Sequence, residues 1–222
     1  MQSVTQAVLS RHSVRAFLPT PVPRQTIEQL LAAAARAPSG GNLQPWHVDV
    51  VAGAELDALT EEVRTSLGGG IEAPEFQVYP ADIRQVHGDR RRRCGEDLYA
   101  SIGIGRDDKA GRWAQFMHNY ALFGAPVGLF FSIDRGFDRP QWAHLGMFMQ
   151  NVMLLAEERG LATCPQEAWA AVHGVVSHFL DLPEERIFYC GIALGHADPA
   201  HPINRCATER EPLDAFARFL GF

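Results

Sequence analysis

The stretch that decides the fold reads Pro38-Ser39-Gly40-Gly41-Asn42-Leu43-Gln44-Pro45-Trp46. Its two prolines and two glycines disfavour a long helix or strand. Apolar residues at helical spacing precede it, and a β-branched alternating run begins at His47, so we expect it to connect a helix over residues 23–36 to a strand over residues 47–51. Its hydroxyl, amides and glycine backbone suit a polar planar ligand, although the same residues serve in ordinary turns.

A second polar stretch, Arg11-His12-Ser13-Val14-Arg15, lies upstream. Two guanidinium groups and a hydroxyl within five residues form a compact anion site whose geometry matches phosphate oxygens. The alternative is a solvated helix end, where arginines complement the helix dipole. His12 is expected to be packed or bonded to the backbone rather than catalytic.

Composition narrows the class of protein. The 222 residues are 46% hydrophobic and 21% charged, which fits one domain that can build a core. A formal net charge of -6 gives no support for a nucleic-acid partner or an anionic membrane. Lys109 is the only lysine, so nearly all positive charge is guanidinium, the better geometry for phosphate.

The four cysteines, Cys94, Cys164, Cys190 and Cys206, show neither a C-x-x-C pair nor metal-ligand spacing. We therefore expect reduced thiols, no metal site and a cytoplasmic protein. The N-terminal residues lack the pattern of a signal peptide, and no apolar run approaches the ~20 residues needed to cross a bilayer.

The remaining sequence alternates between helical and strand patterns. Helices are expected over residues 2–10, 54–67, 112–123 and 140–158 and in segments up to Leu182, and strands over 127–133 and 186–194. Residues 70–112 are the least regular part and are expected to form a lid or flap. Within them, the run Arg90–Arg93 is expected to be a solvated face offset by acidic neighbours. The apolar C-terminal end must dock on its own chain or on a partner.

Four motifs occur in an order that closely resembles the nitroreductase family of FMN enzymes. They are Arg11-x-Ser13-x-Arg15, Pro38-Ser39-x-x-Asn42-x-Gln44-Pro45-Trp46, Gly191-x-Ala193-x-Gly195 and a late Arg210. The run Asn119-Tyr120-x-x-Phe123-Gly124-Ala125-Pro126-Val127 is similar to the subgroup that contains nitrobenzoate reductases and halotyrosine dehalogenases. The resemblance implies an α+β fold, with a mixed, mainly antiparallel sheet flanked by helices. It also implies one FMN-binding domain over residues 1–222 and a domain-swapped homodimer with FMN at the interface.

The resemblance also implies which residues bind FMN. Arg11, His12, Ser13, Arg15 and Arg210 would hold the phosphate and the flavin edge. Pro38, Ser39, Gly40, Asn42 and Gln44 would come from the other subunit. Pro165, Gln166 and Glu167 would lie along the flavin with a backbone N–H near N5, and Gly191 and Gly195 would permit close approach. Ala168 stands where the family often has glycine, and Arg205 is the nearest candidate for a second basic residue.

The implied activity is a ping-pong, two-electron reduction of nitroaromatic or quinone acceptors by NADPH or NADH through FMN, with no catalytic side chain. Tyr79, Arg84 and Tyr99 of the 70–112 segment are expected to contact an anionic aromatic substrate such as a nitrobenzoate. One alternative is reductive dehalogenation of halogenated phenols or tyrosines, which would need a zwitterion-binding lid. Another is a flavin-binding module without NAD(P)H turnover, and a third is a structural helical protein without cofactor.

Overall fold

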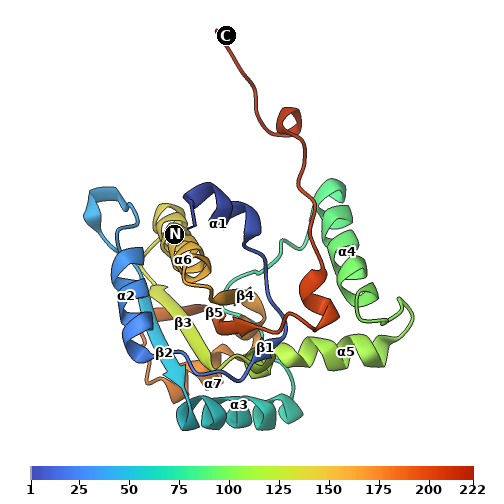
Figure 1. Cartoon of the computed structure of the whole chain (residues 1–222). Coiled ribbons are helices and arrows are strands. Elements are labelled where there is room, and N and C mark those ends of the chain that lie inside the picture. The colour runs from blue at the N-terminus through green and yellow to red at the C-terminus, as the bar shows by residue number, and fades with distance from the viewer. Residues whose placement is uncertain (1) are drawn as a thin grey trace.

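The computed structural model describes residues 2–222 and centres on a five-stranded sheet (Figure 1). The strands are β1 (Phe17–Leu18), β2 (His47–Ala52), β3 (Val127–Asp134), β4 (Ala162–Gln166) and β5 (Arg186–Ala197). The order is β1-β5-β3-β2, with β4 also paired to β5, and all these pairings are antiparallel. The expected α+β fold with a mainly antiparallel sheet is therefore confirmed.

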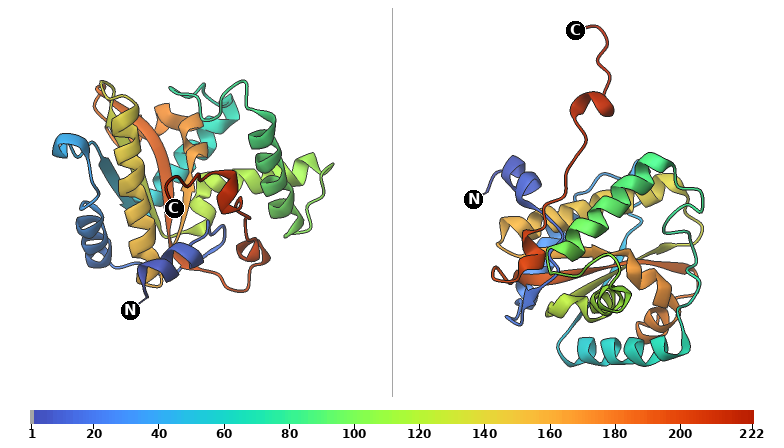
Figure 2. Two further views of the ribbon diagram at one scale, coloured as in Figure 1. Left: turned by 90° about the horizontal axis from the view of Figure 1, so that it is seen from above. Right: turned by 90° about the vertical axis from the view of Figure 1, so that its right-hand side faces the viewer.

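Helices cover both faces of the sheet (Figures 1 and 2). They are α1 (Val4–Ser10), α2 (Arg24–Ala34), α3 (Ala54–Ser66), α4 (Gln85–Ala100), α5 (Lys109–Met117), α6 (Arg139–Glu158) and α7 (His173–Phe179). Successive β3 side chains point to opposite faces. Phe131 joins α2 and α6 in one apolar core, whereas Phe130 joins α3 and α7 in the other. This burial on both faces explains why β3 is a continuous apolar run.

Helix α6 anchors the stretch over residues 38–46. A capping box of Asp138 and Gln141 starts this helix. The ring of Trp46 stacks on Phe148 of α6, with a centroid distance of 4.9 Å and an interplanar angle of 11°. The loop before Trp46 is thereby fixed to the core at its C-terminal end.

The expectation for residues 70–112 was wrong in one respect, because α4 is a regular 16-residue helix. None of its residues is buried, so no apolar face marks it in the sequence. Three of the four arginines in Arg90–Arg93 pair with acidic residues, as expected. Arg92 binds Asp89, Arg91 lies 4.0 Å over the Tyr79 ring, and Arg90 and Arg93 reach glutamates near the C-terminus.

A second difference is that α5 ends at Met117, not at Phe123. The following turn places Leu122, Phe123 and Gly124 at φ values of 49°, 54° and 81°. Leu122 and Phe123 are buried in the core, so tertiary packing overrides the helical pattern. Strands β1 and β4 are present in the structure but were not predicted from the sequence.

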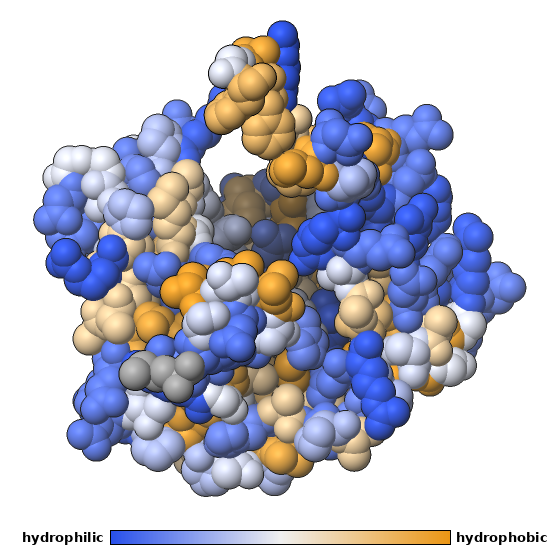
Figure 3. Space-filling view, turned by 45° about the horizontal axis from the view of Figure 1, so that its top comes forward, coloured by the Kyte–Doolittle hydropathy of each residue, from blue (hydrophilic) through white to orange (hydrophobic). Residues whose placement is uncertain are grey.

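The C-terminal residues 212–222, here called the tail, extend away from the rest of the chain (Figures 1 and 2). Leu213, Phe216, Phe219, Leu220 and Phe222 are all exposed. Among the described residues, the apolar side chains of the tail are not buried against their own chain (Figure 3), so docking on a partner remains the expectation that accounts for them. Among residues 2–222, the structure contains no helix with both the length and the apolar character to cross a bilayer.

Candidate functional site

The stretch Arg11–Arg15 lies beside β4. The backbone N–H of Val14 donates to the Thr163 carbonyl at 3.0 Å, and Ser13 forms a parallel bridge with Thr163. Burial raises the pKa of the Cys164 thiol to about 11, while Arg15, Ser13 and Arg11 act in the opposite direction. The Arg15 Nη1 donates to the Ser13 carbonyl at 3.3 Å, so these two predicted anion-binding residues lie together beside Thr163 of β4.

Asn204 fixes this stretch to the end of β5. Its Oδ1 accepts from the Arg15 backbone N–H at 2.8 Å, and its Nδ2 donates to the carbonyls of Ala16 at 2.8 Å and Asp198 at 2.9 Å. Sequence reasoning missed Asn204, since a single asparagine in a loop carries no pattern. His12 is exposed, and its Nδ1 lies 3.1 Å from the Ser10 carbonyl, so the expected backbone contact of His12 is confirmed.

The end of β4 is positioned by Asn119. The Gln166 Nε2 donates to the Asn119 carbonyl at 2.8 Å and to its Oδ1 at 3.1 Å. The indole Nε1 of Trp169 donates to the same carbonyl at 3.1 Å. Asn119 was not predicted as a site residue, although its place at the head of the 119–127 motif was a signal.

Glu167 is exposed, and its Oε1 accepts from the Tyr189 hydroxyl at 3.2 Å. Burial raises the pKa of Tyr189, and the neighbouring Glu167 carboxylate raises it further. Tyr189 therefore stays protonated and holds the carboxylate next to Gln166.

One buried atom in this region supports a bound molecule. Gln166 is 3% exposed, and its Oε1 has no hydrogen-bond partner among the described residues. A buried acceptor left without a donor costs about 1–3 kcal/mol. A planar ligand with a ring N–H, such as the isoalloxazine of FMN, fits this acceptor. The gathered Arg11, Ser13 and Arg15 fit a phosphate on the same ligand.

The loop over residues 38–44 lies elsewhere. It is largely exposed, and both views show it on the far side of α6 from β4 (Figures 1 and 2). Asn42 and Gln44 adopt φ values of 57° and 50°, the left-handed region that non-glycine residues rarely enter. The backbone N–H of Gln44 donates to Ser39 Oγ at 3.0 Å, which helps to hold this conformation.

His144 of α6 supports the same loop and was also missed by sequence reasoning. Its Nε2 accepts from the Gly40 N–H at 3.4 Å. A Cβ added to Gly40 would lie 3.3 Å from the His144 ring, so this contact favours glycine. No hydrogen bond or ion pair in the described part of the chain joins the loop to Arg11–Arg15 or to Gln166.

The two strand glycines approach their own chain closely. A Cβ at Gly191 would lie 3.1 Å from Trp169, and a Cβ at Gly195 would lie 2.6 Å from the Pro126 Cδ. Both glycines are buried in β5. The close approach that they permit in this structure is therefore a packing contact within the chain.

The predicted substrate residues do not meet in one place. Each tyrosine ring is covered by an arginine: Tyr79 by Arg91 at 4.0 Å and Tyr99 by Arg112 at 4.2 Å. Arg84 instead lines a cavity together with Arg210.

Among the described residues, no hydrogen bond joins Arg205 or Arg210, the two basic residues considered near the C-terminus, to the Arg11–Arg15 stretch. Arg210 Nη1 donates to the carbonyls of Thr208 and Glu209 and to the Thr208 hydroxyl, so its side chain turns onto its own segment. Arg205 is exposed at the end of a short 3-10 helix (Pro202–Arg205).

With this geometry in place, comparison with known proteins identifies the family. The model of the nitroreductase family matches residues 8–196, which is most of the chain. This protein belongs to the nitroreductase family. The match spans the gathered Arg11–Arg15 stretch, the loop over residues 38–44 and the end of β4, and it confirms the resemblance inferred from the motifs.

Relatives in sequence and in structure cover nearly the whole chain. The 4-nitrobenzoate reductase of Pseudomonas putida is 37% identical over 97% of this chain and 94% of its own length. The crystal structure of an FMN- and NADPH-dependent nitroreductase, NfnB of Sphigopyxis sp. strain HMH, is 46% identical, with a TM-score of 0.96 over 99% of this chain and all of that chain. The Mycobacterium smegmatis NfnB in complex with NADPH is 30% identical, with a TM-score of 0.92 over 98% of this chain and all of that chain.

Proposed function

We propose that this protein is an FMN-dependent nitroreductase that uses NADPH or NADH to reduce nitroaromatic compounds, nitrobenzoates included. The observation that carries the proposal is the buried Oε1 of Gln166, which has no hydrogen-bond partner among the described residues, at the end of the strand whose Thr163 pairs with the Arg11–Arg15 stretch. The printed activities of relatives such as the 4-nitrobenzoate reductase support the choice of acceptor.

The residues of this chain bind and orient the cofactor. Arg11, Ser13 and Arg15 would hold the FMN phosphate, which carries a charge of about −1.5 to −2 at neutral pH. Pro165, Gln166 and Glu167 would lie along the flavin ring. When bound, FMN supplies the redox chemistry, in which NAD(P)H, a proton and a nitro group yield NAD(P)⁺, a nitroso group and water.

The exposed loop supports a homodimer. The loop lies on the far side of α6 from β4 (Figure 1) and makes no hydrogen bond to Gln166 among the described residues. We infer that its Pro38, Ser39, Gly40, Asn42 and Gln44 complete the site of a second copy. A loop held in the left-handed region with its amides exposed is typical of a preorganised binding segment.

The tail supports the same dimer. Its apolar side chains are exposed, which is costly for a free monomer. Strand β2 lies at the edge of the sheet, and beside it is a cavity of 680 Å³. Its lining from α2 and β2 includes the apolar Ile27, Leu31 and Val51 together with the charged Arg24 and Glu28. We infer that the tail of each subunit docks in this region of the other.

Two experiments test this proposal. Steady-state oxidation of NADPH and NADH with 4-nitrobenzoate tests the activity. Turnover is expected, whereas flavin binding without turnover would indicate a flavin module, and turnover only with a halogenated tyrosine would indicate a dehalogenase. Light scattering of the full chain and of a chain ending at Glu211 tests the dimer. A truncated chain that is still a dimer would contradict the docking of the tail.

A further inference from the structure

The side-chain amide of Gln166 is held in one orientation. Its Nε2 donates to the Asn119 backbone carbonyl at 2.8 Å and to the Asn119 Oδ1 at 3.1 Å, so its two hydrogens have two acceptors. Turning the amide by 180° would place Oε1 against these same two acceptors, where no hydrogen bond could form. The free end of the Gln166 amide is therefore always an acceptor and never a donor.

The orientation of Asn119 is fixed in turn by its neighbours. Its Nδ2 donates to the Phe116 carbonyl at 2.7 Å, so Oδ1 is the end of the Asn119 amide that faces Gln166. The indole Nε1 of the fully buried Trp169 donates to the Asn119 carbonyl at 3.1 Å and fixes that group as well. These contacts, here called the amide lock, join the turn after α5 to the end of β4.

The oxygen that the amide lock leaves free is buried. Gln166 is 3% exposed, and its Oε1 has no hydrogen-bond partner among the described residues. Two other buried side-chain atoms in the described part of the chain share this property, Ser132 Oγ of β3 and His144 Nδ1 of α6. Of the three, only Gln166 belongs to β4, the strand whose Thr163 pairs with Ser13 of the Arg11–Arg15 stretch.

An acceptor that cannot turn distinguishes the two redox states of a flavin. The oxidised isoalloxazine ring carries one N–H, at N3, and the other polar atoms along its edges are acceptors. Uptake of a hydride, which is two electrons and one proton, converts N5 from an acceptor into an N–H donor. A free glutamine amide would turn to match either state, whereas the locked amide of Gln166 matches only a donor.

We propose that Asn119 is a positioning residue that locks the Gln166 amide with its acceptor toward the cofactor, and that this lock favours reduced over oxidised FMN. The inference rests on the proposed FMN-dependent function. Gln166 Oε1 accepts from the N–H that the ring gains on reduction, whereas it meets an acceptor in the oxidised ring. The consequence is a higher midpoint potential of bound FMN, which favours electron transfer from NAD(P)H.

The test compares three variants, Gln166→Met, Asn119→Ala and Ser132→Ala. Gln166→Met removes the acceptor and keeps a side chain of similar length, while Asn119→Ala removes one of the two acceptors that hold the amide. Ser132→Ala is the matched control, because it also removes a buried oxygen without a partner among the described residues, but from β3. Spectroelectrochemical titration gives the midpoint potential of bound FMN, and quenching of flavin fluorescence gives the dissociation constant of oxidised FMN.

In Gln166→Met, we expect the affinity for reduced FMN to fall about tenfold more than the affinity for oxidised FMN, as for loss of one hydrogen bond. For a two-electron couple, this difference lowers the midpoint potential by about 30 mV. Asn119→Ala should lower the potential in the same direction by a smaller amount. Ser132→Ala should leave both the potential and the FMN affinity at the wild-type values.

Equal losses of affinity for the two redox states in Gln166→Met, with an unchanged potential, would overturn the proposal, because Oε1 would then accept from N3–H. An unchanged potential and an unchanged affinity would also overturn it, since Oε1 would then be no more than an unpaired atom of the chain, as in Ser132. A wild-type potential in Asn119→Ala, beside a lowered one in Gln166→Met, would overturn the role of Asn119. Wild-type protein that binds no FMN would refute the proposed function instead.

Discussion

Replacing Asn204 by alanine tests how the Arg11–Arg15 stretch is held. The substitution removes one hydrogen bond to the Arg15 N–H and two to the carbonyls of Ala16 and Asp198. At ~0.5–1.5 kcal/mol each, and with water able to reach this half-buried position, the free energy of unfolding should fall by about 2–3 kcal/mol. Urea denaturation of the apoprotein measures this loss.

The same variant should also bind FMN more weakly, because the backbone of Arg15 is no longer fixed beside β4. Quenching of flavin fluorescence on titration gives the dissociation constant. Asn151→Ala is the matched control, since Asn151 makes a single side-chain bond, to the Ala34 carbonyl at 3.2 Å. It should lose about 1 kcal/mol and keep its FMN affinity. A loss below about 0.5 kcal/mol in Asn204→Ala, or equal FMN affinity in the two variants, would refute the reasoning.

Three further predictions concern packing, thiol reactivity and pH. Gly195→Ala should destabilise the protein by about 1–3 kcal/mol and by more than Gly191→Ala, because its Cβ would lie 2.6 Å from Pro126 rather than 3.1 Å from Trp169; equal melting temperatures would contradict this. A thiol reagent at pH 8 should label the exposed Cys94 rapidly and leave Cys164 unmodified until the protein unfolds, since Cys164 is buried and its pKa is raised to about 11; rapid labelling of Cys164, detected by peptide mass spectrometry, would contradict the burial. Burial raises the pKa of Asp49 above its ordinary value of 3.8, so this carboxyl favours the folded state below that pH and loses its contribution as pH rises through the raised pKa. Asp49→Asn should therefore melt at a higher temperature than wild type at pH 7, with a smaller difference near pH 4, and a difference that grows on acidification would contradict the sign.

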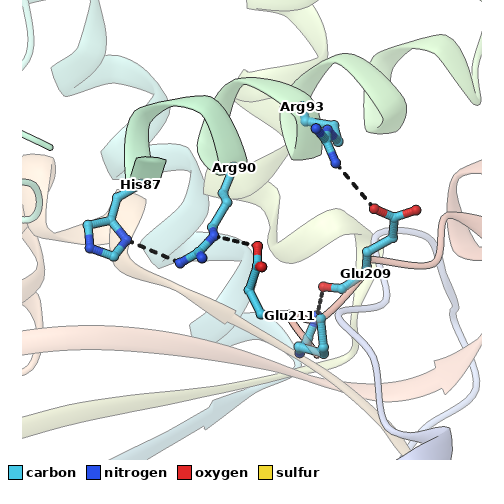
Figure 4. A network of polar contacts seen from close by, with 6 residues as sticks. His87, Arg90, Arg93, Glu209 and Glu211 are labelled. Carbon is cyan, nitrogen blue, oxygen red and sulfur yellow. Dashed lines mark hydrogen bonds and ion pairs between the residues drawn. The ribbon is translucent and has the colours of Figure 1, made fainter. Parts of the chain in front are cut away.

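The sequence predicted those elements whose pattern is local. Strand β3 and helix α6 are long apolar segments with clear ends, and both were placed within one or two residues. Helix α4 was missed because it is polar on all sides, and two of its ion pairs are with residues more than 100 positions later (Figure 4). Strand β4 contains Pro165 and is short, and only its pairing with β5 makes it a strand.

The sequence identified the stretches that form the candidate site, but it did not show how they are arranged in space. The Arg11–Arg15 and 165–167 stretches carry side chains of a recognisable kind, so the motifs identified them. The Asn204 side chain bonds to backbone atoms, and the backbone carbonyl of Asn119 accepts from the Gln166 side chain. No spacing in the sequence indicates either contact. The contacts of Arg210 with Thr208 and Glu209 likewise carry no signal in the sequence.

The most direct test of the central claim is an anaerobic absorption spectrum of the purified protein, recorded before and after NADPH and then after 4-nitrobenzoate in the same cuvette. We predict a flavin spectrum with visible bands that bleach on addition of NADPH and recover with the nitro compound. Protein that shows no flavin spectrum, and that still binds none after incubation with FMN, would contradict the account.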